Sequence, residues 1–255
     1  MTEAIATIEA PEPPTYSWSL LDVLLMTAPT VVLAAAALSS QAFLERLDAF
    51  AARGPGWLSS LVILLVAESL VLAGSVTLLG VLPRRLSWAK VGFRRAQWYW
   101  YLIGPVLAAV VLPVRLGMGL LVLLLLDPTM SQATNLAQVE FPETTWGGAI
   151  AIIFVGGVVV PFAEELFFRG VLYRWLRGRI GVWGGVLVSA ALFGLAHIFL
   201  PTAVSAFVIG LVLAWVYERS ESLWVPFVVH ALNNTGVFTL VFLAVALLQF
   251  MEIPY

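Results

Sequence analysis

The sequence predicts an all-α fold, a polytopic transmembrane helical bundle, from its composition and from the form of its apolar runs. Hydrophobic residues make up 61% of the 255 residues and charged residues 11%, with a mean hydropathy of +0.99. A soluble fold could not bury that much apolar surface. The apolar runs are continuous rather than alternating, which favours helices over the strands of a membrane barrel.

About seven segments are long enough to cross the hydrocarbon core, which takes roughly 20 apolar residues per helix. They are expected at about 18–41, 57–82, 98–126, 146–173, 182–200, 202–217 and 223–250. The third contains Pro113 and Arg115, and a break there would raise the count to eight. Residues 18–255 are expected to form one transmembrane domain. The acidic, proline-bearing residues 1–17 predict a disordered cytoplasmic tail rather than a signal peptide.

Charged residues between the spans predict the orientation of this multi-pass protein in the cell membrane. Two connections are basic and are expected to face the cytoplasm; they contain Arg84, Arg85, Lys90, Arg94 and Arg95, and Arg174, Arg177 and Arg179. The segment 127–146 has three acidic residues and no Lys or Arg, as expected of an outside loop. The N-terminus is therefore predicted inside and the C-terminus outside.

Composition also excludes several classes of function. The chain has no cysteine, which rules out disulfides, thiolate metal sites and a thiol nucleophile. Its net charge of −2 provides no basic surface for nucleic acid. The lipid bilayer is an expected partner, and nothing in the sequence indicates an oligomeric state.

Ionisable residues inside the spans are the candidates for function, because burying charge in hydrocarbon is unfavourable. Glu164, Glu165 and Arg169 in the fourth span would together cost roughly 7 to 10 kcal/mol facing lipid. Glu165 and Arg169 are four residues apart on one helix face and are expected to pair. Glu164 is left without a local partner.

Both histidines of the chain fall in later spans. An antiparallel hairpin about the turn RGRIG would bring His197 to the depth of Glu164, where the two could touch. His230 and Asn234 share a helix face at i, i+4, whereas Asn233 turns away. One carboxylate, two imidazoles and an amide can therefore converge.

Other polar and small residues in the spans are expected to be structural. Glu68 and Arg115, in the second and third spans, are expected to pair or to snorkel, and are left out of the predicted site. The glycine pairs at 156–157 and 184–185 are expected to be positions of close helix packing.

These residues form three motifs that resemble those of the CPBP family, the CAAX proteases and bacteriocin-processing proteins. The motifs are Glu-Glu-x-x-x-Arg, Phe-x-x-x-His and His-x-x-x-Asn, matched here by Glu164, Glu165, Arg169, Phe193, His197, His230 and Asn234. The resemblance covers about residues 146–235, with a catalytic core expected at about 146–250. It implies an intramembrane endopeptidase, although the family also includes members that need no catalysis.

The chemistry of the side chains agrees with what the resemblance implies. Glu164 with His197 would activate a water molecule as general base, and His230 with Asn234 would donate hydrogen bonds to the oxyanion. The Glu165 to Arg169 pair would hold the helix and orient Glu164. The substrate would be a CAAX-type prenylated C-terminus or a bacterial peptide or membrane protein.

Alternatives for metal and function stay open at this point. Glu164, His197 and His230 could form a three-ligand zinc site, but without the His-Glu-x-x-His spacing we favour a metal-free mechanism. The first alternative function is a scaffold or bacteriocin-immunity protein that only binds. The second is a proton-coupled transporter with a relay through Glu68, Glu164 and His197.

Overall fold

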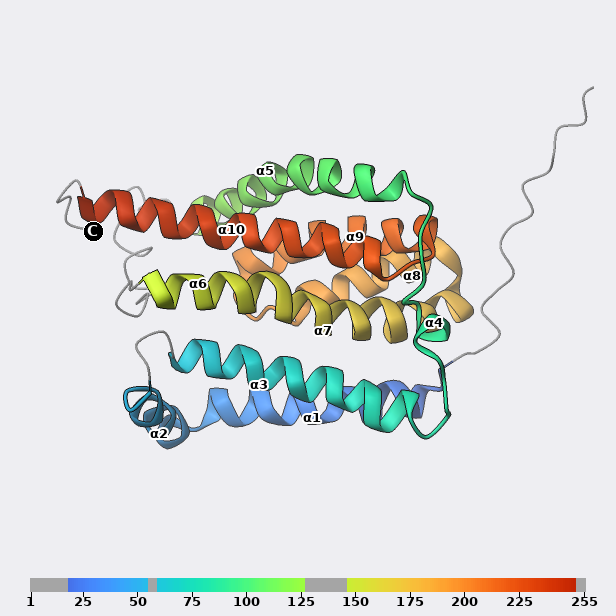
Figure 1. The fold of residues 1–255 in the computed structure, drawn as a ribbon, viewed down its shortest axis with the longest axis horizontal. Coiled ribbons are helices and arrows are strands. Elements are labelled where there is room, and N and C mark those ends of the chain that lie inside the picture. The colour runs from blue at the N-terminus through green and yellow to red at the C-terminus, as the bar shows by residue number, and fades with distance from the viewer. Residues whose placement is uncertain (1–17, 55–58, 127–145, 251–255) are drawn as a thin grey trace, which may run out of the picture.

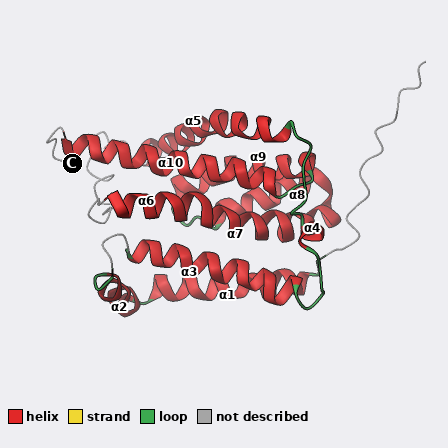
Figure 2. Cartoon of the chain, viewed as in Figure 1, coloured by secondary structure: helices red, strands yellow, loops and turns green. Residues whose placement is uncertain are grey.

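The computed structural model describes residues 18–54, 59–126 and 146–250, and over these ranges the chain is a helical bundle without strands (Figure 1 and Figure 2). The predicted fold class is therefore confirmed. The expected tail, residues 1–17, and most of the expected outside loop, residues 127–145, lie outside the described residues.

The helices follow the chain in the order α1 (Leu20–Ser39), α2 (Gln41–Ala51), α3 (Ser60–Ser75), η1 (Val76–Val81), α4 (Trp88–Val91), α5 (Trp100–Leu126), α6 (Trp146–Phe154), η3 (Val155–Val159), α7 (Val160–Phe167), η4 (Phe168–Tyr173), α8 (Arg174–Leu195), α9 (Leu200–Ser220) and α10 (Trp224–Phe250). The η elements are π-helical turns inside longer helices. Six stretches of the described residues are long and apolar enough to cross a membrane: Leu20–Ala37, Ser60–Val81, Trp100–Leu126, Trp146–Leu195, Leu200–Ser220 and Trp224–Ala244.

The expected fourth and fifth spans fall within one of these six stretches, Trp146–Leu195, in which two helices meet at a non-helical residue, Gly181. The direction reverses at Gly181, which has φ 74° and ψ −179°, a conformation that glycine adopts without steric penalty. Beyond it, Gly185 packs against Tyr173 and Arg177. The predicted hairpin is therefore present, and counting its two arms separately recovers seven passes.

The third span is a single helix, so the expected alternative of eight spans does not form. Helix α5 runs for 27 residues through Pro105 and Pro113. Proline removes one backbone hydrogen bond from a helix, but packing against α9 and α10 holds α5 together across that gap. Arg115 lies on the same helix and is buried.

Both basic connections lie at one end of the bundle, as the predicted alternation of spans requires. The Arg174 guanidinium donates to the carbonyls of Lys90 and Val91, at 2.5 and 3.0 Å. At the same end the Leu223 amide donates to the Gly92 carbonyl at 2.8 Å. This end carries the two positive segments, and its assignment to the cytoplasm stays a prediction.

The N-terminal helix is fixed to the motif-bearing part of the chain. Ser19 and Asp22 form a capping box at the start of α1, which satisfies free amide groups of the first turn. Asp22 also pairs with Arg84, and the Trp18 indole donates to the Gly170 carbonyl at 2.9 Å. These contacts hold α1 and α3 beside α7 (Figure 1).

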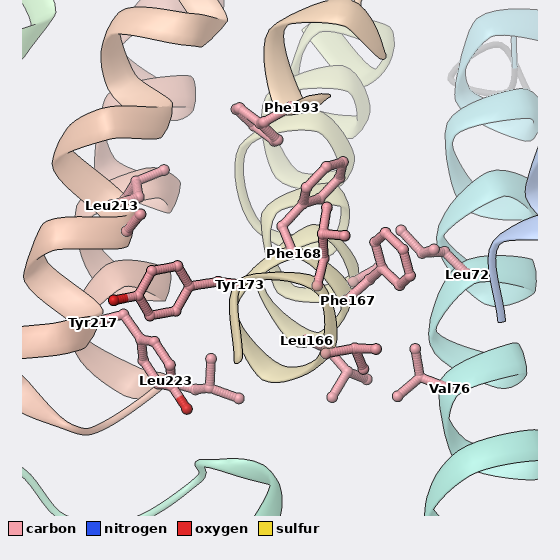
Figure 3. Close-up of a cluster of buried hydrophobic side chains, with 14 of the residues drawn as sticks. Leu72, Val76, Leu166, Phe167, Phe168, Tyr173, Phe193, Leu213, Tyr217 and Leu223 are labelled. Atoms are coloured by element: carbon pink, nitrogen blue, oxygen red, sulfur yellow. The ribbon is translucent and has the colours of Figure 1, made fainter. Parts of the chain in front are cut away.

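The buried core lies between α3, the α7 and η4 segment, and α9. Leu72 and Val76 approach from α3 and η1 toward Leu166 and Phe167, as Figure 3 shows. On the other side of the same helix, Tyr173 lies near the α9 residues in Figure 3. Many large apolar side chains of the outer faces are exposed, as expected where lipid is the solvent.

Glycines allow α10 to approach the π-helical turn η3 closely. A Cβ atom at Gly156 would lie 2.5 Å from the Phe238 ring, and one at Gly157 would lie 2.4 Å from the Thr235 hydroxyl and 3.1 Å from its Cα. The prediction that this pair serves helix packing is supported by these contacts. The close approach matters for function, because α10 carries His230 and Asn234 on this side.

We expect Gly157→Ala to destabilise the protein by about 1–3 kcal/mol, the usual effect of overpacking, because the Thr235 backbone must move. Gly117→Ala is the matched control, since a Cβ there meets nothing within 4 Å and alanine is the better helix former. Thermal unfolding in detergent measures both. Equal melting temperatures for the two variants would contradict the packing role.

Candidate active site

The glutamate pair lies on α7 between two π-helical turns, η3 and η4. Such turns rotate the following residues relative to a regular α-helix and are frequent at functional sites. Glu165 points into the bundle and is 0% exposed, whereas Glu164 retains 16% of its side-chain exposure. Adjacent carboxylates therefore occupy different environments.

Glu165 is the centre of a buried ion-pair group. Its Oε1 atom accepts from Arg169 Nη1 at 2.7 Å and from His230 Nδ1 at 2.8 Å. Arg169 also donates to the Gly210 carbonyl of α9 at 3.2 Å, and its guanidinium lies 4.8 Å from the Phe193 ring centroid. The predicted pairing of Glu165 with Arg169 is confirmed, and it joins α7, α9 and α10.

His230 lies between the two glutamates rather than on an open surface. It is 1% exposed, and its Nε2 atom lies 3.5 Å from Glu164 Oε2. Because Nδ1 faces a carboxylate, that nitrogen donates. His230 thus connects the buried carboxylate to the one that was predicted to be catalytic.

His197 begins the turn after α8 and is oriented by its own helix. Its Nδ1 atom lies 2.9 Å from the Phe193 carbonyl, which can only accept, so Nδ1 carries a proton and Nε2 of the neutral ring carries the lone pair. The Phe193 ring packs against both imidazoles, with centroids 5.0 Å from His197 and 5.5 Å from His230. The phenylalanine of the second motif therefore separates the two histidines.

Glu164 and His197 face one cavity of about 540 Å³. The contact expected between them is not direct, since no hydrogen bond joins the two side chains among the described residues. Asn234 lines the same cavity, and His230 lies behind Glu164 without lining it. Three of the four predicted catalytic residues thus share a space with room for water and a peptide segment.

The cavity has two further charged residues that the sequence analysis set aside, Glu68 on α3 and Arg115 on α5. They were expected to pair or to snorkel, but Arg115 instead donates from Nη1 to Asn234 Oδ1 at 2.6 Å and to Asn233 Oδ1 at 3.0 Å. The unfavourable burial of charge that singled out the fourth span applied equally to these two residues. That signal could have identified them.

Polar groups also reach the cavity from α1, which contributes Thr27 and Thr30. Within the described residues, the buried Thr30 hydroxyl makes no hydrogen bond, and neither does Glu164 Oε2, which lies 3.5 Å from His230 Nε2. Unpaired buried polar atoms are rare in proteins. Their presence around this space is consistent with a cavity that takes a polar guest.

The alternative zinc ligand set does not come together in the described part of the chain. No three His, Asp or Glu side chains are grouped there as a metal ion requires. The two ring nitrogens of His230 face different glutamates, Nδ1 toward Glu165 and Nε2 toward Glu164.

Comparison with known protein families covers the segment that carries the three motifs. Residues 146–236 match the sequence model of the family described as type II CAAX prenyl endopeptidase Rce1-like. This segment is therefore similar to that peptidase family. The family that the three motifs predicted is therefore confirmed, and all three motifs lie inside the matched range.

A curated relative of the chain supports the same assignment. The chain is 30% identical over 86 residues to "Putative membrane peptidase YdiL" of Bacillus subtilis (strain 168), which covers 34% of this chain and 35% of the relative. The match thus spans about a third of the relative's length. No solved structure matches the chain significantly.

We expect Arg169→Ala to destabilise the helical bundle by about 3–5 kcal/mol, because it leaves the Glu165 carboxylate buried without its cation. The matched control is Arg94→Ala, which removes an arginine from a pair whose side chains are 53% and 40% exposed and should cost about 0–1 kcal/mol. Reversible unfolding in mixed micelles gives both values. A difference under about 1 kcal/mol would show that the buried pair does not hold the bundle.

Proposed function

We propose that this protein is an intramembrane endopeptidase that hydrolyses a peptide bond with a water molecule activated by Glu164 and His197. The observation that carries the proposal is the single cavity lined by both residues and by Asn234. The peptidase family matched by residues 146–236 and the relative described as a membrane peptidase support it. The surrounding helices are apolar enough to keep this cavity within the bilayer.

The two proposed bases can act on one water molecule. Glu164 lines the cavity, and His197 has the lone pair on Nε2 because Nδ1 faces a carbonyl. A carboxylate or imidazole within hydrogen-bond reach of water can take its proton as the oxygen attacks. The water oxygen then bonds to the carbonyl carbon, and the proton passes to the leaving amine as the C–N bond breaks.

The oxyanion formed in this step needs hydrogen-bond donors, and we assign that role first to Asn234. Its amide lines the cavity and can donate from Nδ2. His230 was expected to share this role, but both of its nitrogens are directed at the glutamates. We propose that His230 acts by positioning the two glutamates.

The proposed substrate is a membrane-associated polypeptide, either a CAAX-type prenylated C-terminus or a bacterial peptide or membrane-protein segment. The matched family is described by the first class, and the bacterial relative is described only as a membrane peptidase. A panel that contains both kinds of peptide distinguishes the two classes.

We expect Glu164→Gln to lower cleavage by at least about 10²-fold, the usual contribution of a positioned base. Purified protein in lipid vesicles would be assayed by mass spectrometry against the panel. Glu45→Gln is the control, because Glu45 is an exposed carboxylate on α2. Full activity in a folded Glu164→Gln variant would refute the glutamate mechanism.

We expect a chelator to leave the rate unchanged within about twofold, because the proposed base is a carboxylate with an imidazole rather than a metal-bound hydroxide. The rate would be measured after dialysis against EDTA and 1,10-phenanthroline. Loss of activity with recovery on adding zinc would instead establish a metal enzyme.

The same experiments address the alternative functions. No cleavage of any peptide by a folded wild-type protein would favour the scaffold or immunity role. Glu68, Glu164 and His197 line one cavity, which is also what a proton relay would need. Proton flux into the vesicles without cleavage would favour the transporter.

A further inference from the structure

Arg115 is a charged residue of the cavity that lies outside the segment matched to the family. It comes from the middle of α5 and is 7% exposed. Its guanidinium donates to three side chains: Ser205 Oγ at 2.9 Å, Asn233 Oδ1 at 3.0 Å and Asn234 Oδ1 at 2.6 Å. One side chain therefore connects α5 to α9 and α10 at the cavity wall.

These bonds determine how the Asn234 amide is turned. Arginine has only donors, so the atom that faces Nη1 must be the amide oxygen. The amide nitrogen is then directed the other way, where its one contact among the described residues is the Gly156 carbonyl at 3.4 Å. An NH₂ group has two hydrogens, so at least one is available to another acceptor.

The positive charge is not needed to join three helices. All three acceptors are neutral, and within the described residues no carboxylate forms an ion pair with Arg115. A neutral donor would avoid the unfavourable burial of charge in a membrane helix. A charged donor to the amide oxygen does, however, polarise the amide and strengthen the bonds that its nitrogen donates.

Asn233 provides an internal comparison for this geometry. Its oxygen also accepts from Arg115, but its nitrogen donates to the Ala108 carbonyl at 3.1 Å, and the residue is 0% exposed. The same arginine thus holds two neighbouring amides. Only Asn234 is left with a loosely bound nitrogen in a cavity-lining residue.

We propose that Arg115 is a positioning residue for the hydrolysis, which fixes the Asn234 amide so that its nitrogen donates to the oxyanion. This inference rests on the proposed function. It predicts that Arg115 affects the rate of the chemical step through Asn234 rather than substrate binding.

A double-mutant cycle tests this dependence directly. In the wild-type background, Arg115→Met should lower kcat by about 10- to 100-fold, which does not exceed the effect on kcat of removing one oxyanion donor. KM should change less than threefold. In the Asn234→Ala background, measured under single-turnover conditions, the same substitution should lower the rate by less than about threefold. Equal losses in both backgrounds, or an effect on KM alone, would overturn the proposal.

Two further variants keep the test valid if Arg115→Met does not fold. Arg115→Lys keeps the charge but lacks the planar fork that reaches Ser205 and both amides at once. Arg115→Lys should lower kcat by less than the 10- to 100-fold expected for Arg115→Met. This loss should appear only in protein that retains Asn234. Arg94→Met is the control for removing an arginine, since Arg94 lies outside the cavity lining.

The outcome also separates this inference from the proposed function. Cleavage by the wild type that is lost in Glu164→Gln establishes the endopeptidase whatever Arg115 does. An additive cycle in that active enzyme would refute only the role of Arg115. Absence of cleavage by the wild type would overturn both.

Discussion

The buried Glu165 carboxylate is the interaction on which the rest of the site depends. One of its oxygens accepts from both Arg169 and His230, and Arg169 continues to the Gly210 carbonyl. A charge in a low-dielectric interior is stable only with its partners in place. The positions of α7, α9 and α10 are therefore coupled, and the direction of the neighbouring Glu164 follows from that of Glu165.

Neighbouring polar residues in the site divide structural and cavity-lining roles. Glu165 is enclosed while Glu164 lines the cavity, and Asn233 is enclosed while Asn234 lines it. Consecutive helical residues point about 100° apart, so one of each pair can satisfy buried partners while the other meets the cavity. The two histidines are divided similarly, with the Phe193 ring between them.

The cavity is completed by helices that the CPBP match does not cover. Helix α1 contributes Thr27 and Thr30, α3 contributes Glu68, and α5 contributes Arg115. Contacts at the start of α1, from Trp18 to the Gly170 carbonyl and from Asp22 to Arg84, hold α1 against η4 and against the turn that follows η1. The motif segment supplies the proposed bases, and the N-terminal helices enclose them.

The sequence by itself determined the fold class, the hairpin, the Glu165 to Arg169 pair and the candidate residues, because these follow from hydropathy, from helix periodicity and from the unfavourable burial of charge. It did not predict that His230 binds Glu165, that Glu164 and His197 meet across a cavity rather than directly, or that α5 stays whole through Pro113. Nor did it reveal that Arg115 belongs to the site. Those outcomes depend on the rotation and spacing of helices far apart in the chain, which close packing such as that of Gly157 on Thr235 decides. Local periodicity places a residue on one face of its own helix. Only tertiary packing decides which other helix or cavity that face contacts.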